Sequence, residues 1–254
     1  DPHNKSLYEF LVDYENATAM ISACKNYKLN ELQALVQKQV PVDAQNNSHE
    51  TALYHAALAG FEDAVTYLLK QGANPNHKTI VNDTPLHAAV AARSLDCTMH
   101  LLRYGAQLLV NNDGQTPLDI SKRMPDNPCT KHLMLVDAWM QLCEELQLGS
   151  WDPMESLLNK IPDLRFFRDP VTRGTCIHMA VMYEQEHILN KLMDMRLPLH
   201  WKNRNMKTAL ALLIENHSKA FSEATKRRLQ GDEHGIELLL FINDVNKLEN
   251  LLQA

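Results

Sequence analysis

Glycine is scarce in this chain, with eight residues among 254. None of them forms a Walker A loop, a dinucleotide-binding fingerprint or a GxSxG nucleophile motif. The five cysteines contain no CxxC pair, so their spacing predicts neither a disulfide framework nor a zinc site. No apolar run approaches 18 residues, so the sequence predicts no transmembrane segment. These absences remove the usual signs of a cofactor or metal site, and we expect neither.

A basic surplus is also missing, because 25 Lys and Arg stand against 31 Asp and Glu, for a formal net charge of -6. Dedicated nucleic-acid binders usually carry such a surplus, so no nucleic acid is expected as a partner. The apolar fraction of 45% is that of a folded protein. The odd number of scattered cysteines fits a reducing, intracellular setting, cytoplasmic or nuclear. The chain begins at Asp1 rather than Met, so we expect a fragment or a processed form.

The chain does contain an internal repeat, whose period is close to 33 residues. Short segments recur that begin at Thr18, Thr51, Thr84, Thr116, Thr175 and Thr208. Seventeen and eighteen residues after a threonine come apolar pairs: Leu35–Val36, Leu68–Leu69, Leu101–Leu102, Leu133–Met134 and Leu192–Met193. Glycine turns such as the one at Gly72 follow the pairs. A fixed period of this length predicts stacked supersecondary units, none of which buries its apolar face alone.

The segments TPLHAAV at 84–90 and KQGANPN at 70–76 resemble the ankyrin repeat. The resemblance implies an all-α ankyrin-repeat solenoid of about seven helix-turn-helix repeats with short β-hairpin fingers. Each threonine would cap the first helix of a repeat. His87 and His178 would be structural, tying their helix to the neighbouring hairpin by hydrogen bonds. Other residues replace this histidine elsewhere, so some hairpins should lack the tie; they are Tyr54, Ile21 and Asp119.

The repeat pattern breaks in two places. An irregular joint is expected near 123–140, where the chain runs on in a helical pattern and the hairpin before a fifth repeat near Met140 is missing. A second finger looks lost after Thr208, and Leu251–Leu252 fit the pair of a last repeat that begins near His234. We therefore expect two blocks, residues 1–135 with repeats 1–4 and residues 136–254 with repeats 5–7. Since the chain stops without a polar cap, the natural protein should continue past Ala254.

Candidate catalytic groups are few. The twelve histidines contain no HxxxH pair and no zinc-finger spacing with cysteine. Cys176 and His178 are close in sequence, yet both fall inside the repeat motif TCIHMAV. Glu144 and Glu145 sit on a predicted helix and are better read as a solvated face. The sequence therefore predicts a protein that is not an enzyme.

The resemblance implies two binding surfaces that together line a concave groove, the hairpin tips and the exposed face of the first helix. Loops on a rigid scaffold carry function more often than core positions do. The residues predicted for this helix face lie seven and eight positions after a threonine: Arg123, Met124, Met182 and Tyr183. The predicted finger residues are Ile80, Val81, Asn112, Asp113, Val171, Arg173, Trp201, Lys202, Arg204 and Lys207.

Two features of these surfaces are distinctive. Ile80 and Val81 are apolar at a tip, which marks an interface unless they pack on the next hairpin. On two later fingers Arg168 joins four of the predicted cations, with Tyr183 and Trp201 nearby in the repeat template. Such a cationic fork suits an acidic peptide, a phosphate group or an anionic lipid head, and the alternative is a merely solvated finger.

The leading interpretation is a protein–protein interaction module, monomeric by itself, that serves as a scaffold, adaptor or targeting domain. Its partner would be another protein or peptide, with an acidic one favoured. Three alternatives stay open. The chain could be a regulatory ankyrin segment of a larger enzyme or channel, a microbial effector that engages host proteins, or an enzyme with a pocket at the 123–128 joint.

Overall fold

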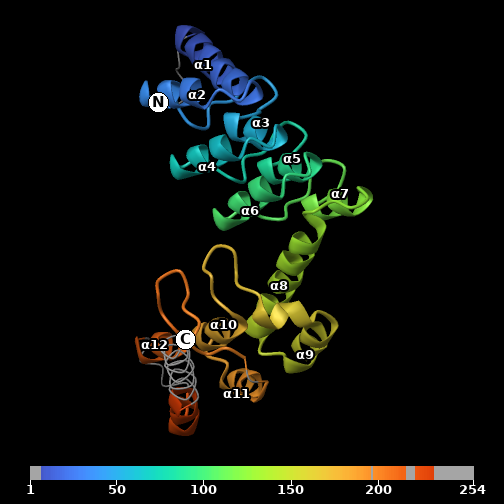
Figure 1. Cartoon of the computed structure of the whole chain (residues 1–254), viewed down its shortest axis with the longest axis vertical. Helices are drawn as coiled ribbons and strands as arrows, with labels where there is room; N and C mark the ends of the chain where they lie inside the picture. Colours follow the sequence, from blue (N-terminus) through green and yellow to red (C-terminus); the bar gives the residue numbers. More distant parts are fainter. Residues whose placement is uncertain (1–6, 196, 216–220, 232–254) are drawn as a thin grey trace, which may run out of the picture. The chain divides into compact units, whose positions relative to one another are not determined.

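The computed structural model describes residues 7–195, 197–215 and 221–231, with only the backbone for residues 7–13 (Figure 1). The chain divides into two compact units, Asp1–Met134 and Leu135–Ala254. The division falls inside one continuous helix, α8 (Thr130–Leu148).

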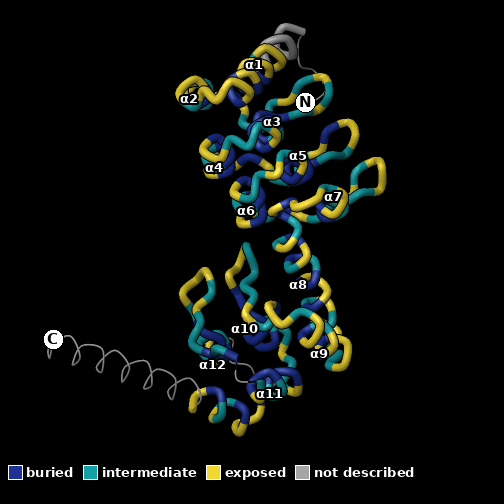
Figure 2. The backbone as a smooth tube through the Cα atoms, turned by 45° about the vertical axis from the view of Figure 1, so that its right-hand side comes forward, coloured by how far each residue is buried: buried dark blue, intermediate teal, exposed yellow. Residues whose placement is uncertain are grey.

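The first unit is a stack of short antiparallel helix pairs. Its first helices, α1, α3, α5 and α7, contact one another in chain order, and the second helices α2, α4 and α6 form a row beside them (Figure 1). The bounds are α1 Leu7–Lys25, α2 Leu29–Gln37, α3 Ala52–Leu58, α4 Glu62–Lys70, α5 Pro85–Ala91, α6 Leu95–Arg103 and α7 Pro117–Arg123. The loops that precede α3, α5 and α7 project on one edge of this stack (Figure 2).

The second unit repeats the helix pair in a less regular form. Its elements after α8 are α9 Trp151–Lys160, the 3-10 helix η1 Pro162–Phe166, α10 Cys176–Met182, α11 Glu186–Asp194 and α12 Ala209–Glu215. Residues 223–231 are also helical. Helix α10 packs against α11 and α12, and the core includes Trp139, Leu142, Ile177 and Leu189.

Threonine begins the first helix of a repeat at five places that the period predicts, and at one of them, Thr208, the hydroxyl accepts from Ala211 N at 3.2 Å at the start of α12. Thr51, Thr84, Thr116 and Thr175 are extended in backbone and cap α3, α5, α7 and α10. Pro85 and Pro117 follow two of them in the first turn, where a missing N–H leaves no bond unmade. The apolar pairs Leu68–Leu69, Leu101–Leu102 and Leu192–Met193 are buried as predicted, since the second helix turns them onto the core.

The fingers are turn-rich loops rather than β-hairpins. In the part of the chain that the structure describes there is no strand, and Gln45 and Thr51 form an isolated antiparallel bridge. A backbone bond closes each finger: Asn46 N to Glu50 O, Thr79 N to Asp83 O, Asn111 N to Gln115 O, Asp169 N to Gly174 O and Asn203 N to Lys207 O. The expectation of β-hairpins was therefore wrong, because each closure is too short for a ladder.

Two other expectations need correction. Thr18 does not cap a helix, because α1 runs through it and its hydroxyl donates to Tyr14 O at 2.8 Å. Met134 is 47% exposed although its pair partner Leu133 is buried, because α8 continues past the place where a second helix should end.

The missing finger before Met140 is confirmed, since α8 runs unbroken from Thr130 to Leu148. The last predicted repeat, near His234, and its Leu251–Leu252 pair lie outside the described residues. No helix within residues 7–195, 197–215 and 221–231 is long and apolar enough to cross a lipid bilayer.

Candidate partner-binding fingers

The fingertips of the first unit are joined by hydrogen bonds into a row. Ile80 N donates to Ser48 O at 3.0 Å, and Asn112 N donates to Val81 O at 2.9 Å. The Asn112 side chain also donates to Ile80 O at 3.2 Å. The side chains of Ile80 and Val81 nevertheless remain 57% and 48% exposed. An apolar pair thus stands in solvent on a backbone that is held in place.

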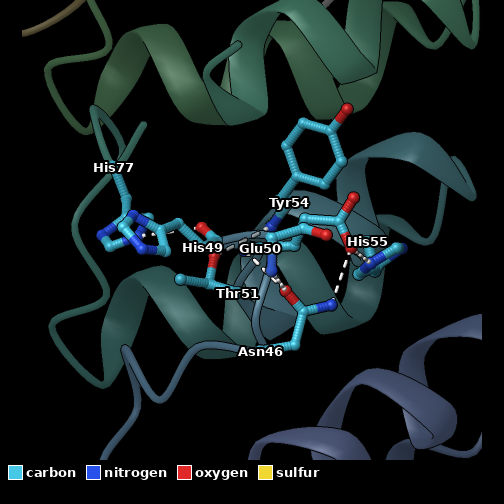
Figure 3. A network of polar contacts seen from close by, with 8 residues as sticks. Asn46, His49, Glu50, Thr51, Tyr54, His55 and His77 are labelled. Atoms are coloured by element: carbon cyan, nitrogen blue, oxygen red, sulfur yellow. Dashed lines mark hydrogen bonds and ion pairs between the residues drawn. The ribbon is translucent and has the colours of Figure 1, made fainter. Parts of the chain in front are cut away.

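A polar network fixes the first of these fingers (Figure 3). Asn46 Nδ2 donates to Glu50 at 2.8 Å, and His55 Nε2 lies 2.9 Å from the same carboxylate. Burial alone would raise the pKa of Glu50, but the bonds from Asn46 and His55 lower it overall. From the next finger, His77 Nε2 lies 3.1 Å from His49 O. The network is structural, because its polar groups form hydrogen bonds with one another, within the first finger and between the two fingers.

Two histidines tie a helix to the following finger, as the family resemblance implied. His87 Nε2 lies 3.1 Å from Gln115 O, and His178 Nε2 lies 3.1 Å from Lys207 O. Tyr54 holds the position of His87 one repeat earlier. Its side chain points away from the Glu50 network (Figure 3), and it makes no hydrogen bond through its hydroxyl within the described residues. The finger at residues 79–83, which follows Tyr54 in the chain, therefore lacks this hydrogen bond from the helix before it, as expected.

The two fingers of the second unit, residues 167–175 and 198–208, are locked to each other. Arg204 N donates to Thr172 O at 2.6 Å, which repeats the fingertip bond of the first unit. Arg168 bridges the fingers, because its Nε donates to Arg173 O at 3.2 Å and its Nη2 donates to Lys202 O. Its guanidinium lies 5.5 Å from the centre of the Trp201 ring, within cation–π range. The bridge holds the two loops as one surface.

An open hollow of about 510 Å³ lies on this surface. Four cations line it: Arg168, Arg173, Lys202 and Arg204. In the described part of the chain, none of them forms an ion pair with a carboxylate. Burial, and after it the positive charge of Arg173, lower the pKa of the Arg168 guanidinium. The lining residues are Arg168, Arg173, His200, Trp201, Lys202, Asn203, Arg204 and Met206. This second-unit hollow is thus a concentrated positive site on a chain of net charge -6.

The structure brings together four of the predicted site residues in this hollow: Arg173, Trp201, Lys202 and Arg204. Lys207 does not line it, because its ammonium pairs with Glu215 and its carbonyl accepts from His178. Val171 is 38% exposed beside the hollow, and its carbonyl lies 3.5 Å from Arg204 Nη1.

The remaining predicted residues lie elsewhere. Asn112 and Asp113 are exposed at the last finger of the first unit. Arg123 and Met124 lie at the end of α7, where Arg123 is exposed and Met124 half-buried. Met182, 53% exposed, and the half-buried Tyr183 lie at the end of α10 and do not line the hollow.

Sequence reasoning missed Met206, which is 72% exposed at the tip of the second finger. It has φ of 59°, a left-handed conformation that favours glycine or asparagine. The signal was available, because Met206 stands two residues before Thr208, as Asn82 stands before Thr84. Tip positions on either side of Met206 were predicted, so the same offset rule would have found it.

The thiols and metal-ligating groups offer no competing site in the described residues. Burial raises the pKa of the Cys176 and Cys143 thiols to about 12, so both stay protonated at neutral pH. No group of three or more His, Cys, Asp and Glu side chains there is placed to hold a metal ion.

Comparison with known proteins agrees with this architecture. A family model described as "Ankyrin repeats (3 copies)" matches residues 3–79, and one described as "Ankyrin repeat" matches residues 82–113. The chain is 26% identical over 153 residues to ankyrin repeat domain-containing protein 37 of Mus musculus, which covers 59% of this chain and 96% of that protein.

Two other relatives are longer proteins. The putative palmitoyltransferase ZDHHC13 of Danio rerio is 25% identical over 213 residues, which is 78% of this chain but 33% of that protein. The inactive serine/threonine-protein kinase TEX14 of Bos taurus is 34% identical over 88 residues, 34% of this chain and 6% of that protein. The chain thus spans a third or less of these two relatives. Both family models describe ankyrin repeats, and over the residues they match, 3–79 and 82–113, the structure repeats helix pair and finger in phase with them, so this part of the chain consists of ankyrin repeats.

Proposed function

We propose that this chain is a scaffold, adaptor or targeting module that binds an acidic segment of another protein at the second-unit hollow. Ankyrin repeats are generally interaction modules, and the matching family models support that role here. One observation supports an acidic partner. Among the described residues, no carboxylate pairs with Arg168, Arg173, Lys202 or Arg204. Unpaired cations on a fixed backbone give an anion both attraction and a defined place.

The first unit would add contacts through its fingertips. Ile80 and Val81 supply apolar area, and the neighbouring Asn112 and Asp113 supply a polar rim. The helix-end residues Arg123, Met124, Met182 and Tyr183 are proposed as flanking contacts. Since the fingers are already joined by hydrogen bonds, little ordering cost would fall on binding. We also propose that the chain is monomeric, that its setting is intracellular and that its two blocks act as separate binding units.

A charge-reversal experiment tests the acidic partner. Arg173→Glu/Lys202→Glu should weaken binding of a fluorescein-labelled octaglutamate peptide by about tenfold or more, because two attractive charges become repulsive. Fluorescence polarisation across a salt titration measures both affinity and its salt dependence. Lys160→Glu/Arg227→Glu is the matched control, since it makes the same charge change at exposed positions away from the hollow. If the control variant binds the peptide as weakly as Arg173→Glu/Lys202→Glu, the effect comes from net charge alone. If neither variant changes the affinity for the peptide, the proposal is rejected.

A second candidate is a regulatory ankyrin segment of a longer protein. The match to the putative palmitoyltransferase ZDHHC13 favours it, because it covers 78% of this chain and only 33% of that protein. The full-length open reading frame decides this candidate: a catalytic or membrane domain in the same frame would support it, and a frame that encodes no further domain on either side of residues 1–254 would reject it.

A further inference from the structure

We propose that the second-unit hollow binds a phosphorylated serine, threonine or tyrosine side chain of the partner protein. This inference rests on the proposed function and names the anionic group that the acidic segment would carry. Four cations, Arg168, Arg173, Lys202 and Arg204, line one hollow of about 510 Å³. A single concentrated anion can reach several of them at once, whereas the carboxylates of a peptide are spread along its backbone.

The guanidinium of Arg168 is oriented before any ligand arrives. Its Nε and Nη2 are held by the carbonyls of Arg173 and Lys202, and the ring of Trp201 lies against it. Its Nη1 makes no hydrogen bond to protein among the described residues. A fixed planar donor with one nitrogen unused suits an oxygen-rich tetrahedral anion, because the donor loses little rotamer freedom on binding.

The charge of the hollow also favours a dianion. A phosphorylated side chain carries a charge of about -1.5 to -2 at neutral pH and three strong acceptor oxygens. A glutamate carries one charge and two oxygens, so it would neutralise less of the positive charge that lines the hollow. The one acid within residues 167–175 and 198–208 is Asp169, and it already accepts from Thr172 N at 2.6 Å.

The rim of the hollow indicates that the phosphate belongs to a protein segment. Met206 is 72% exposed at the fingertip and lines the hollow together with Trp201. Phe166, 56% exposed, lies 6.5 Å from Trp201 between ring centres. Apolar area beside a cationic centre fits a modified side chain that is flanked by apolar residues. A free phosphate ion would make no use of this rim.

The test uses the full chain and three fluorescein-labelled peptides of sequence GGAXLAGG, in which X is phosphoserine, glutamate or serine. We expect the phosphoserine peptide to bind at least about tenfold tighter than the glutamate peptide, with inorganic phosphate as a competitor. Arg173→Gln/Arg204→Gln should abolish this preference, and Lys160→Gln/Arg227→Gln should keep it. Circular dichroism and the thermal midpoint confirm that each variant is folded.

Other outcomes overturn the inference in distinguishable ways. If the glutamate and phosphoserine peptides bind equally, the hollow recognises an anionic side chain without preferring a dianion, and the acidic-partner proposal stands without the phosphate. If octaglutamate binds and no phosphopeptide does, the phosphate site is wrong while the proposed function survives. If phosphatidylserine vesicles bind and no peptide does, the occupant is a lipid surface and both proposals fall.

Discussion

At the scale of single residues, two buried histidines hold the most sharply defined positions. His87 Nδ1 accepts from Thr84 N at 3.1 Å, and His178 Nδ1 accepts from Thr175 N at 3.2 Å. Since Nδ1 is the acceptor, Nε2 must carry the proton that reaches the carbonyl of the next finger. If Nδ1 were protonated, its N–H would face the backbone N–H of the threonine, and neither donor would have an acceptor. Burial lowers the pKa of both side chains, so the fold requires neutral imidazoles.

This requirement predicts that the protein loses stability in mild acid. An unfolded histidine titrates near pH 6.5, and each folded pKa lies lower, so the unfolded chain binds more protons below that pH. The free energy of unfolding should therefore be steady above about pH 6.5 and fall below it, by at most about 1.4 kcal/mol per pH unit for each histidine.

Urea denaturation between pH 8 and pH 5 measures this effect. His87→Gln/His178→Gln should be less stable at pH 8 but show a shallower decline toward pH 5, because two titrating groups are gone. His55, whose pKa burial also lowers, leaves some slope in the variant. An identical pH profile in the wild type and the variant would show that these histidines are already protonated or do not titrate on unfolding.

At the scale of elements, the repeat is clearer in backbone conformation than in residue type. Left-handed residues recur at the fingertips as His49, Asn82, Gly114, Arg173 and Met206. They recur again after the second helices at Gln39, Gly72 and Gly105. The residues differ while the conformation repeats, because the geometry of the turn is set by the packing of helices on each side.

Gly105 and Gly72 allow this backbone effect to be tested in isolation. Their φ values are 88° and 89°, and a Cβ at either position would meet nothing within 4 Å. Gly105→Ala should therefore destabilise the protein by about 1 kcal/mol through left-handed strain alone. Gly231→Ala is the control, since its backbone is helical with equally open space, and there alanine should stabilise by about 0.5–1 kcal/mol. Chemical denaturation gives both values, and the same sign for the two changes would contradict the strain argument.

How far the sequence predicts these elements depends on what positions them. Thr84 and Thr175 were predicted as helix caps because the capping bond is local to three residues. Thr18 was misassigned, because α1 continues through it and no local signal separates a cap from a mid-helix threonine. The cationic cluster could be inferred from the repeat template. The role of Arg168 could not, because it depends on two carbonyls from different fingers.

At the scale of the whole molecule, the chain provides a spectroscopic label for one unit alone. All three tryptophans, Trp139, Trp151 and Trp201, belong to the unit Leu135–Ala254. Far-ultraviolet circular dichroism reports on the helices of both units. In a repeat array each element is stabilised by its immediate neighbours, so distant parts can unfold at different denaturant concentrations.

The two signals predict how a core defect in the first unit will spread. Leu86 lies in α5 and is fully buried, so Leu86→Ala should destabilise the first unit by about 3 kcal/mol through lost contacts and a cavity. We expect the part of the circular dichroism transition that comes from the first unit to move to a lower urea concentration. The transition followed by the tryptophan signal should keep its midpoint. Leu189→Ala, in the core of the second unit, is the reciprocal control and should move the tryptophan transition. If Leu86→Ala shifts both signals equally, cooperativity extends through α8, and the two blocks unfold as one unit.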